Sequence, residues 1–322
     1  MHFNAALTLA LMASGSQAAT ITPRASNYWN GFSKLKTLFV FGDSYSRTGF
    51  DASSKDQPSA TNPLGNPAFP GRTSANGPNW VGHLTATYNA SSFLTYNYGA
   101  SGATLDISIV NNNGYDVIQE INDDFLPYHT EGKTFASESS LFAVWIGIND
   151  IANSYLNGDP DVNADIFASF RYRIDTLWEA GARNFLLLTV PPLEQAPRIT
   201  GSSASATRIP LIASATQDWN KRVNAFQKRI KYLHPTATVF VYDTYPLFER
   251  VMDDPSHYKE TAIYKDTTSY CSAYQNGTPE MDTKLDECDY AADEYFWLNS
   301  FHPTSAMHKL LAKHVAKYLS SQ

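Results

Sequence analysis

Four short segments of the sequence carry residue types that together could hydrolyse an ester. Ser44 follows an apolar run at Gly42-Asp43-Ser44, and Gly102 lies in the glycine-containing segment 98–104. Asn149 lies in segment 147–151, and His302 in segment 299–304. A serine hydroxyl becomes a nucleophile when a neighbouring base takes its proton, and a histidine is suited to that task. The segments therefore predict acyl transfer, with Ser44 as the nucleophile and His302 as the base.

The same segments could stabilise the negative charge that develops on the substrate oxygen. A tetrahedral intermediate carries an oxyanion, which needs hydrogen-bond donors that are already in place. The backbone N–H groups of Ser44 and Gly102 and the side-chain amide of Asn149 are candidate donors. Each segment alone is common in ordinary turns and strand exits, whereas the four together, in this order, are far more specific. Pro303 is a common first residue of a helix, so we expect His302 at a helix entrance.

Parallel strands and covering helices are the elements expected to position these residues. Amphipathic stretches with apolar residues at three- and four-residue spacing, such as 166–178, separate the apolar runs. This alternation predicts a parallel sheet between helices, and ligands of such sheets bind outside the carboxyl ends of the strands. His83, His234 and His314 are interpreted as structural. Nearly continuous apolar runs, typical of strands covered on both faces, are found at 37–41, 94–98, 141–146, 184–190 and 238–242.

The four segments resemble the conserved blocks of the SGNH, or GDSL-type, hydrolases from about residue 37 to the end. The matching stretches are "FGDSYSRTG" with Ser44, "NYGASGAT" with Gly102, "WIGIND" with Asn149 and "FHPT" with His302. The resemblance implies a three-layer α/β/α fold with a five-stranded parallel, flavodoxin-like sheet. It implies an oxyanion hole of Ser44, Gly102 and Asn149, and no metal or organic cofactor.

Within this family the chain is most similar to the fungal acetyl esterases of carbohydrate esterase family 16. This narrower resemblance rests on the secreted type of chain and on the long loop before "FWLNSFHPT". It implies removal of acetyl groups from sugars or oligosaccharides. Two other interpretations stay open: a lipase or phospholipase acting on acyl lipids, and a non-catalytic secreted binding protein on the same fold. The sequence does not determine the natural ester, the position on the sugar or the oligomeric state.

One position departs from the family's pattern. An aspartate usually stands three residues before the histidine, and here that residue is Asn299. An aspartate would orient the imidazole and stabilise its charged form, whereas an asparagine can accept the hydrogen bond but brings no charge. Three interpretations remain open: Asn299 orients His302, Ser44 and His302 act as a dyad, or another acid serves, with Asp150, Asp289 and Asp293 as candidates.

The first 19 residues resemble a secretory signal peptide, with an apolar run at 5–12 and small residues up to Ala19. The remaining residues, 20–322, are expected to form one domain that is secreted and has no stable membrane association. The net charge of −7, without a cluster of Lys and Arg, argues against nucleic-acid binding. The expected partner is a small-molecule or oligosaccharide ester.

Two further features, the glycosylation sequons and the cysteine pair, are consistent with export. Asn89 and Asn276 lie in N-glycosylation sequons. Cys271 and Cys288 are expected to form a disulfide outside the cell rather than to remain as free thiols. Two long polar segments, 51–79 and 253–298, interrupt the α/β pattern, and we expect them to be functional loops at the rim of the site.

Overall fold

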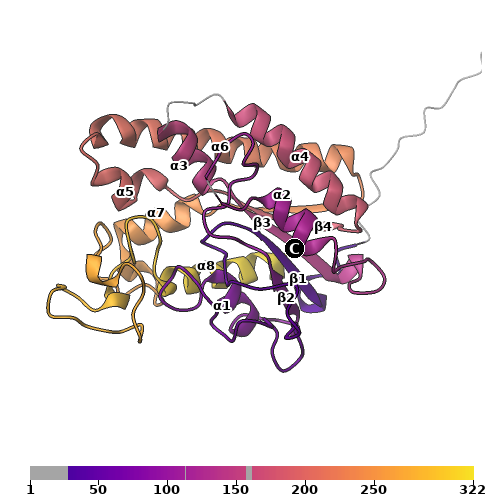
Figure 1. Ribbon diagram of the computed structural model, residues 1–322, viewed down its shortest axis with the longest axis horizontal. Coiled ribbons are helices and arrows are strands. Elements are labelled where there is room, and N and C mark those ends of the chain that lie inside the picture. Colours follow the sequence, from indigo (N-terminus) through magenta and orange to yellow (C-terminus); the bar gives the residue numbers. More distant parts are fainter. Residues whose placement is uncertain (1–27, 113, 157–161) are drawn as a thin grey trace, which may run out of the picture.

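The computed structural model describes residues 28–112, 114–156 and 162–322, so the predicted signal peptide at 1–19 lies outside the described residues. Five parallel strands form one sheet in the order β2-β1-β3-β4-β5 (Figure 1). This is the flavodoxin-like order, and it confirms the predicted fold class. The central pair, β1 and β3, is in register from Thr37 opposite Ser140 to Gly42 opposite Trp145. The strands are β1 (Thr37–Gly42), β2 (Leu94–Asn97), β3 (Ser140–Trp145), β4 (Asn184–Leu188) and β5 (Thr238–Tyr242).

Helices cover both faces of the sheet. On one face α1 (Trp80–Ala86) packs against α8 (Ser305–Ser320), and on the other α6 (Ser205–Leu233) contacts α3 (Ile148–Leu156) and α4 (Asn163–Glu179) (Figure 1). Three further helices are α2 (Val117–Gln119), which continues into a π-helical turn at Glu120–Phe125, α5 (Pro197–Thr200) and α7 (Tyr245–Asp253). Single 3₁₀ turns lie at Phe32–Lys34, Ser137–Ser139, Leu193–Gln195, Pro255–His257, Ser272–Tyr274 and Ala292–Glu294. In the described part of the chain, none of the helices is both long and apolar enough to span a membrane.

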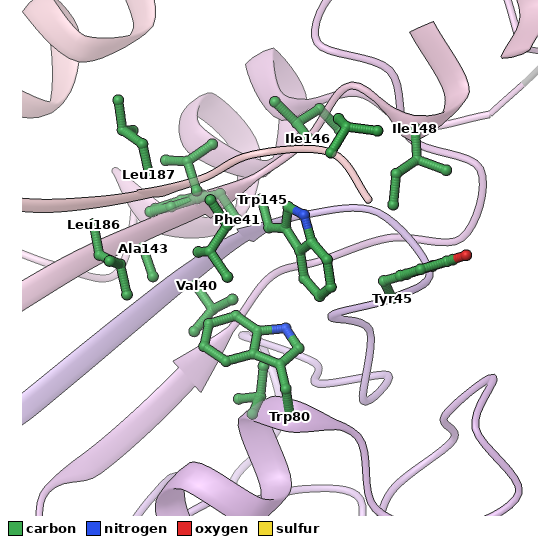
Figure 2. Packing of buried hydrophobic residues seen from close by; sticks show 14 of the residues in the cluster. Val40, Phe41, Tyr45, Trp80, Ala143, Trp145, Ile146, Ile148, Leu186 and Leu187 are labelled. Atoms are coloured by element: carbon green, nitrogen blue, oxygen red, sulfur yellow. The ribbon is translucent and has the colours of Figure 1, made fainter. Parts of the chain in front are cut away.

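Buried aromatic side chains pack together near the end of β1. On the α1 side of the sheet, the Trp145 ring of β3 lies edge-on to Trp80 and Tyr45, with ring centroids 6.0 and 5.5 Å apart (Figure 2). The indole N–H of Trp80 donates a hydrogen bond of 3.0 Å to Ser46 Oγ. The turn that carries Ser44 therefore packs on the hydrophobic core.

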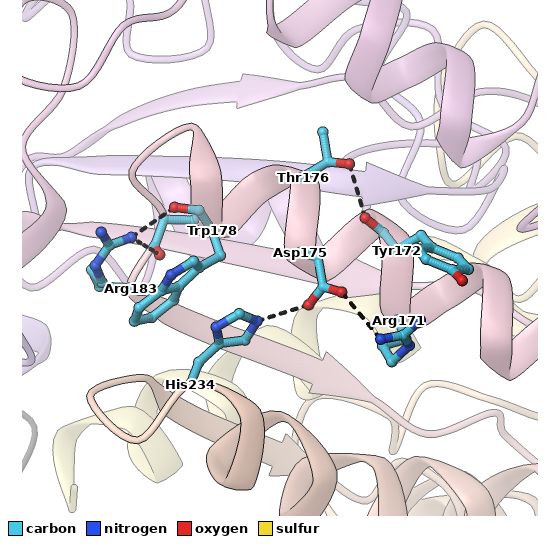
Figure 3. A network of polar contacts seen from close by, with 8 residues as sticks. Arg171, Tyr172, Asp175, Thr176, Trp178, Arg183 and His234 are labelled. Atoms are coloured by element: carbon cyan, nitrogen blue, oxygen red, sulfur yellow. Dashed lines mark hydrogen bonds and ion pairs between the residues drawn. The ribbon is translucent and has the colours of Figure 1, made fainter.

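A network of polar contacts, which includes none of the predicted site residues, holds α4 in place. Asp175 of α4 accepts a hydrogen bond of 2.8 Å from His234 Nε2 and lies 3.6 Å from Arg171 Nη1 (Figure 3). The Arg183 guanidinium lies 3.8 Å from the centroid of the Trp178 ring, and its Nη1 donates to the Trp178 carbonyl oxygen. The contacts of His234 agree with its structural interpretation.

The two long polar segments lie side by side and are joined by hydrogen bonds. Thr278 N donates to Asn76 Oδ1 at 2.8 Å, and Asn76 Nδ2 donates to Thr278 Oγ1 at 2.8 Å. The predicted disulfide is present between Cys271 and Cys288. A small separate core that includes Tyr274, Tyr295 and Leu298 packs around this disulfide.

Candidate active site

The structure places Ser44, His302 and Asn299 in one chain of hydrogen bonds. His302 Nε2 lies 2.8 Å from Ser44 Oγ, although the residues are 258 positions apart in the sequence. His302 Nδ1 lies 2.9 Å from Asn299 Oδ1. Ser44 is buried at the end of β1, where the strand stops and a turn begins. The arrangement is that of a nucleophile, a base and a residue that orients the base.

The hydrogen bonds of Asn299 determine which ring nitrogen of His302 carries the proton. Asn299 Oδ1 also accepts from the backbone N–H groups of Phe301 and His302, both at 3.0 Å, so this atom is the amide oxygen. An oxygen of this kind only accepts, and His302 Nδ1 is therefore the protonated nitrogen. Nε2 is left with its lone pair directed at the Ser44 hydroxyl, which is the form that a general base requires.

Asn299, and none of the three candidate acids, contacts the imidazole in the described part of the chain. Asp150 Oδ1 accepts a hydrogen bond of 3.0 Å from Leu105 N, on the other side of the site. Asp293 lines a separate cavity that includes His83, and Asp289 lies beside Tyr295. Of the interpretations left open by the sequence, the geometry supports the one in which Asn299 orients His302.

Burial keeps the His302 imidazole neutral. Removal from solvent, assisted by the positive charge of Arg198, lowers the pKa of His302 to about 4. Arg198 reaches this position because its backbone N–H donates 2.8 Å to the Ser300 carbonyl and its guanidinium lies over the Phe301 ring. Asn299 has no negative charge that would oppose the shift. The base is therefore ready to accept a proton even in mildly acidic solution.

The position of His302 relative to the last helix differs from the prediction. α8 begins at Ser305 with Thr304 as its N-cap, so Pro303 lies before the helix and the prediction that it is the first helical residue was wrong. The physical reason is that Thr304 has an extended backbone, and its hydroxyl bonds to the Tyr295 carbonyl at 2.8 Å. His302 still lies at the entrance to the helix, in the short segment held by Asn299.

The predicted oxyanion donors lie on neighbouring strand ends. Ala100 N donates 2.9 Å to the Gly42 carbonyl, which joins the loop that carries Gly102 to the end of β1. Asn149, in the first turn of α3, donates 3.0 Å from Nδ2 to the Ala103 carbonyl, and the second N–H of this amide is available to a substrate. Ser44 contributes its own backbone amide at the same edge of the sheet.

Two positions near the site require glycine for steric reasons. A Cβ atom on Gly42 would lie 2.1 Å from the Trp145 carbonyl oxygen of the neighbouring strand. Gly102 has a φ of +76°, and a Cβ there would lie 2.9 Å from Asn112 Nδ2. Only glycine combines this left-handed backbone with such close approach. Alanine at position 102 would therefore disturb the loop as well as the donor.

Three fully buried carboxyl groups lie under the site, and sequence reasoning did not assign them this place. Asp43 Oδ1 accepts from Tyr45 N at 2.9 Å, and burial raises the pKa of Asp43 to about 8. Burial likewise raises the pKa of Asp150 to about 7 and that of Glu120 well above its ordinary value. Asp43 and Asp150 flank predicted donors in the sequence, whereas Glu120 lies in an amphipathic stretch that carries no motif assigned to the site.

A cleft of about 600 Å³ reaches Asn299 from the surface. It lies between the two long polar segments, which supports the prediction that both border the site. Its lining is mixed: the half-exposed side chains of Phe69 and Met281 lie beside prolines and glycines and beside hydroxyl, amide and charged side chains. Asn276 of the predicted sequon is exposed and belongs to this lining. Asn89, by contrast, donates 2.9 Å from Nδ2 to the Thr85 carbonyl.

Comparisons with known proteins identify the family of the chain. The family model described as GDSL-like Lipase/Acylhydrolase matches residues 38–315. An acetylesterase of Thermothelomyces thermophilus is 32% identical over 330 aligned positions, which cover 98% of this chain and 97% of the relative. An acetylesterase of Hypocrea jecorina is 24% identical, over 89% of this chain and 90% of the relative. The solved acetylxylan esterase of Geobacillus stearothermophilus has a TM-score of 0.45 at 16% identity, over 88% of this chain and 94% of that one.

The chain belongs to the GDSL-like lipase/acylhydrolase family. It is a carboxylic ester hydrolase of this family, as the resemblance of its four segments implied.

Proposed function

We propose that the protein is a secreted esterase that removes acetyl groups from carbohydrates. The observation that carries the ester chemistry is the hydrogen-bonded chain from Ser44 Oγ through His302 to Asn299. Support for the acetyl group and the sugar comes from the two related acetylesterases. Support for secretion comes from the N-terminal sequence pattern and the Cys271–Cys288 disulfide.

In the first half of the reaction Ser44 becomes acetylated. Ser44 Oγ attacks the carbonyl carbon of the ester while its proton moves to His302 Nε2. The oxyanion is stabilised by the backbone N–H groups of Ser44 and Gly102 and by the Asn149 amide. His302 then gives its proton to the departing sugar oxygen, which leaves as an alcohol.

In the second half water replaces the sugar. His302 Nε2 takes a proton from the water, and the resulting hydroxide attacks the acetyl carbonyl. A second tetrahedral intermediate forms in the same oxyanion hole and collapses as His302 returns the proton to Ser44 Oγ, which releases acetic acid that ionises to acetate. Throughout, Asn299 holds the His302 Nδ1–H and keeps Nε2 aimed at the reacting atoms.

The proposal is tested by labelling and by substrate comparison. A fluorophosphonate should label the wild-type protein but not Ser44→Ala, while Ser53→Ala, which changes an exposed serine in the first long loop, should label normally. Turnover of 4-nitrophenyl acetate and of acetylated oligosaccharides should exceed turnover of 4-nitrophenyl palmitate. A preference for the palmitate ester would replace the proposed substrate by an acyl lipid, and an active Ser44→Ala variant would overturn the mechanism.

A further inference from the structure

Glu120 joins the two backbone segments that carry the predicted oxyanion donors. Its side chain is fully buried in the π-helical turn that follows α2. Glu120 Oε2 accepts from Gly42 N at 2.8 Å, and Oε1 accepts from Ala100 N at 3.2 Å. Gly42 ends β1, and Ala100 lies in the loop after β2. One carboxyl group thus bridges the ends of two adjacent strands.

Each of the two residues that Glu120 bonds lies the same number of positions before a predicted oxyanion donor. Gly42 lies two residues before Ser44, and Ala100 lies two residues before Gly102. Because the carboxyl group is rigid and planar, it constrains the distance between the two peptide groups that it bonds. Any movement of either segment relative to the other stretches one of these hydrogen bonds.

Packing alone does not account for a carboxyl group at this position. Burying an ionisable side chain is costly, and an apolar side chain would fill the same space without that cost. Asp43 and Asp150, the other buried carboxyl groups under the site, each bond a backbone N–H of one segment, Tyr45 N and Leu105 N respectively. Glu120 bonds one N–H in each of two segments, and these are the segments that must keep a common spacing for the oxyanion.

We propose that Glu120 is a positioning residue of the hydrolytic reaction. Its carboxyl group sets the spacing between the Ser44 and Gly102 amides, and it contacts neither the substrate nor His302. The proposal rests on the assignment of Ser44 and Gly102 as oxyanion donors. It does not depend on which ester is the natural substrate, so it is tested with 4-nitrophenyl acetate.

Glu120→Gln tests the role of the carboxyl group most directly. Glutamine has the same size but only one acceptor oxygen, so its NH₂ group would face one of the two backbone N–H groups and push that segment away. A displaced donor affects the transition state more than substrate binding. We expect kcat to fall by roughly 10- to 100-fold, with KM changed by less than about threefold. The acidic limb of the pH–rate profile should stay in place, because His302 keeps its surroundings.

Glu194→Gln is the matched control. Glu194 is also a buried glutamate after a strand, but it accepts from the Tyr245 hydroxyl at 2.5 Å and bonds none of the three donors. Its loss should lower the melting temperature and leave kcat within about threefold of wild type. If Glu120→Gln does not fold, Glu120→Asp takes its place. Aspartate is one methylene shorter and cannot reach both segments, so the same fall in kcat is expected.

Three results would overturn the proposal. The first is a folded Glu120 variant with the kcat of the wild-type protein. The second is a change in KM alone, which would make Glu120 a determinant of binding. The third is a displaced acidic limb, which would mean that Glu120 acts through His302. An inactive wild-type protein would instead contradict the esterase mechanism itself.

Discussion

Replacing Asn299 by aspartate should raise the pKa of His302 and increase the rate at neutral pH. The new carboxylate would take the place of Asn299 Oδ1, which lies 2.9 Å from His302 Nδ1. It would stay ionised, because the Phe301 and His302 backbone N–H groups, both at 3.0 Å, favour the charged form. A negative charge at this distance stabilises the imidazolium.

The magnitude follows from the geometry. An opposite charge within this range shifts a pKa by roughly 1 to 3 units. Burial and Arg198 hold the pKa of His302 at about 4 in the natural protein, and Asn299→Asp should move it upward by that amount. Each unit corresponds to about 1.4 kcal/mol of stabilisation of the imidazolium. If between half and all of one such unit is expressed in the transition state, kcat above the new pKa rises by about 3- to 10-fold.

The assay is the pH dependence of kcat/KM for acetate release from 4-nitrophenyl acetate between pH 3.5 and 8. Only neutral His302 can act as a base, so a higher pKa moves the acidic limb to higher pH. Asn299→Ala is the comparison, because it removes the three hydrogen bonds that hold the His302 segment and should lower kcat by ~10-fold or more. An acidic limb that Asn299→Asp leaves unmoved, or an Asn299→Ala variant as active as wild type, would refute the role of this residue.

Three further predictions can be tested on the same protein. Arg198→Ala should raise the pKa of His302 and move the acidic limb upward by a small amount, because Arg198 is exposed and its charge is screened by solvent; an unmoved limb would count against this electrostatic effect. Reduction of Cys271–Cys288 should lower kcat/KM while the far-UV circular dichroism stays native, because the disulfide tethers the segment that leads to the site; full activity after reduction would contradict this. Burial raises the pKa of Asp43 from 3.8 to about 8, so the folded protein retains a proton that the unfolded chain releases, and the contribution of Asp43 to the free energy of unfolding should fall as pH rises through this range. Asp43→Asn cannot ionise, so its free energy of urea unfolding should fall less, or rise more, between pH 4 and 8 than that of the wild-type protein; an equal pH dependence in both proteins would contradict the assignment.

Much of the fold could be predicted from the sequence because it depends on local patterns. The run Leu38–Phe41 is apolar throughout, as a central strand covered on both faces must be, and it forms most of β1. Three of the four chemical segments could be predicted to meet by one rule, since the carboxyl ends of parallel strands share an edge. That rule predicted Ser44, Gly102 and Asn149 at the same edge of the sheet, and His302 was expected there at the start of the last helix.

The partner of His302 was decided by the tertiary structure. Four side chains, Asn299 and three aspartates, were compatible with the sequence, because a carboxyl or amide group can reach a histidine from many loop paths. The choice depends on the path of residues 299–302, where Asn299 Oδ1 accepts two backbone N–H groups and the ring N–H together. Such a three-way contact is a property of one loop conformation and has no signature in residue type or spacing.

The contacts of Glu120 could be predicted from the sequence even less than those of Asn299. Glu120 lies in an amphipathic stretch whose apolar residues Val117, Ile121 and Phe125 are four positions apart, and its own carboxyl group is nevertheless fully buried and bonds Gly42, which is 78 residues away in the sequence. Periodicity reports which face of a helix is apolar, and it cannot report that an acidic residue will accept hydrogen bonds from backbone N–H groups at the ends of two strands. The sequence determined which strands meet and which residues could do chemistry, whereas the spacing between the donors was decided by a long-range contact that exists only after the chain has packed.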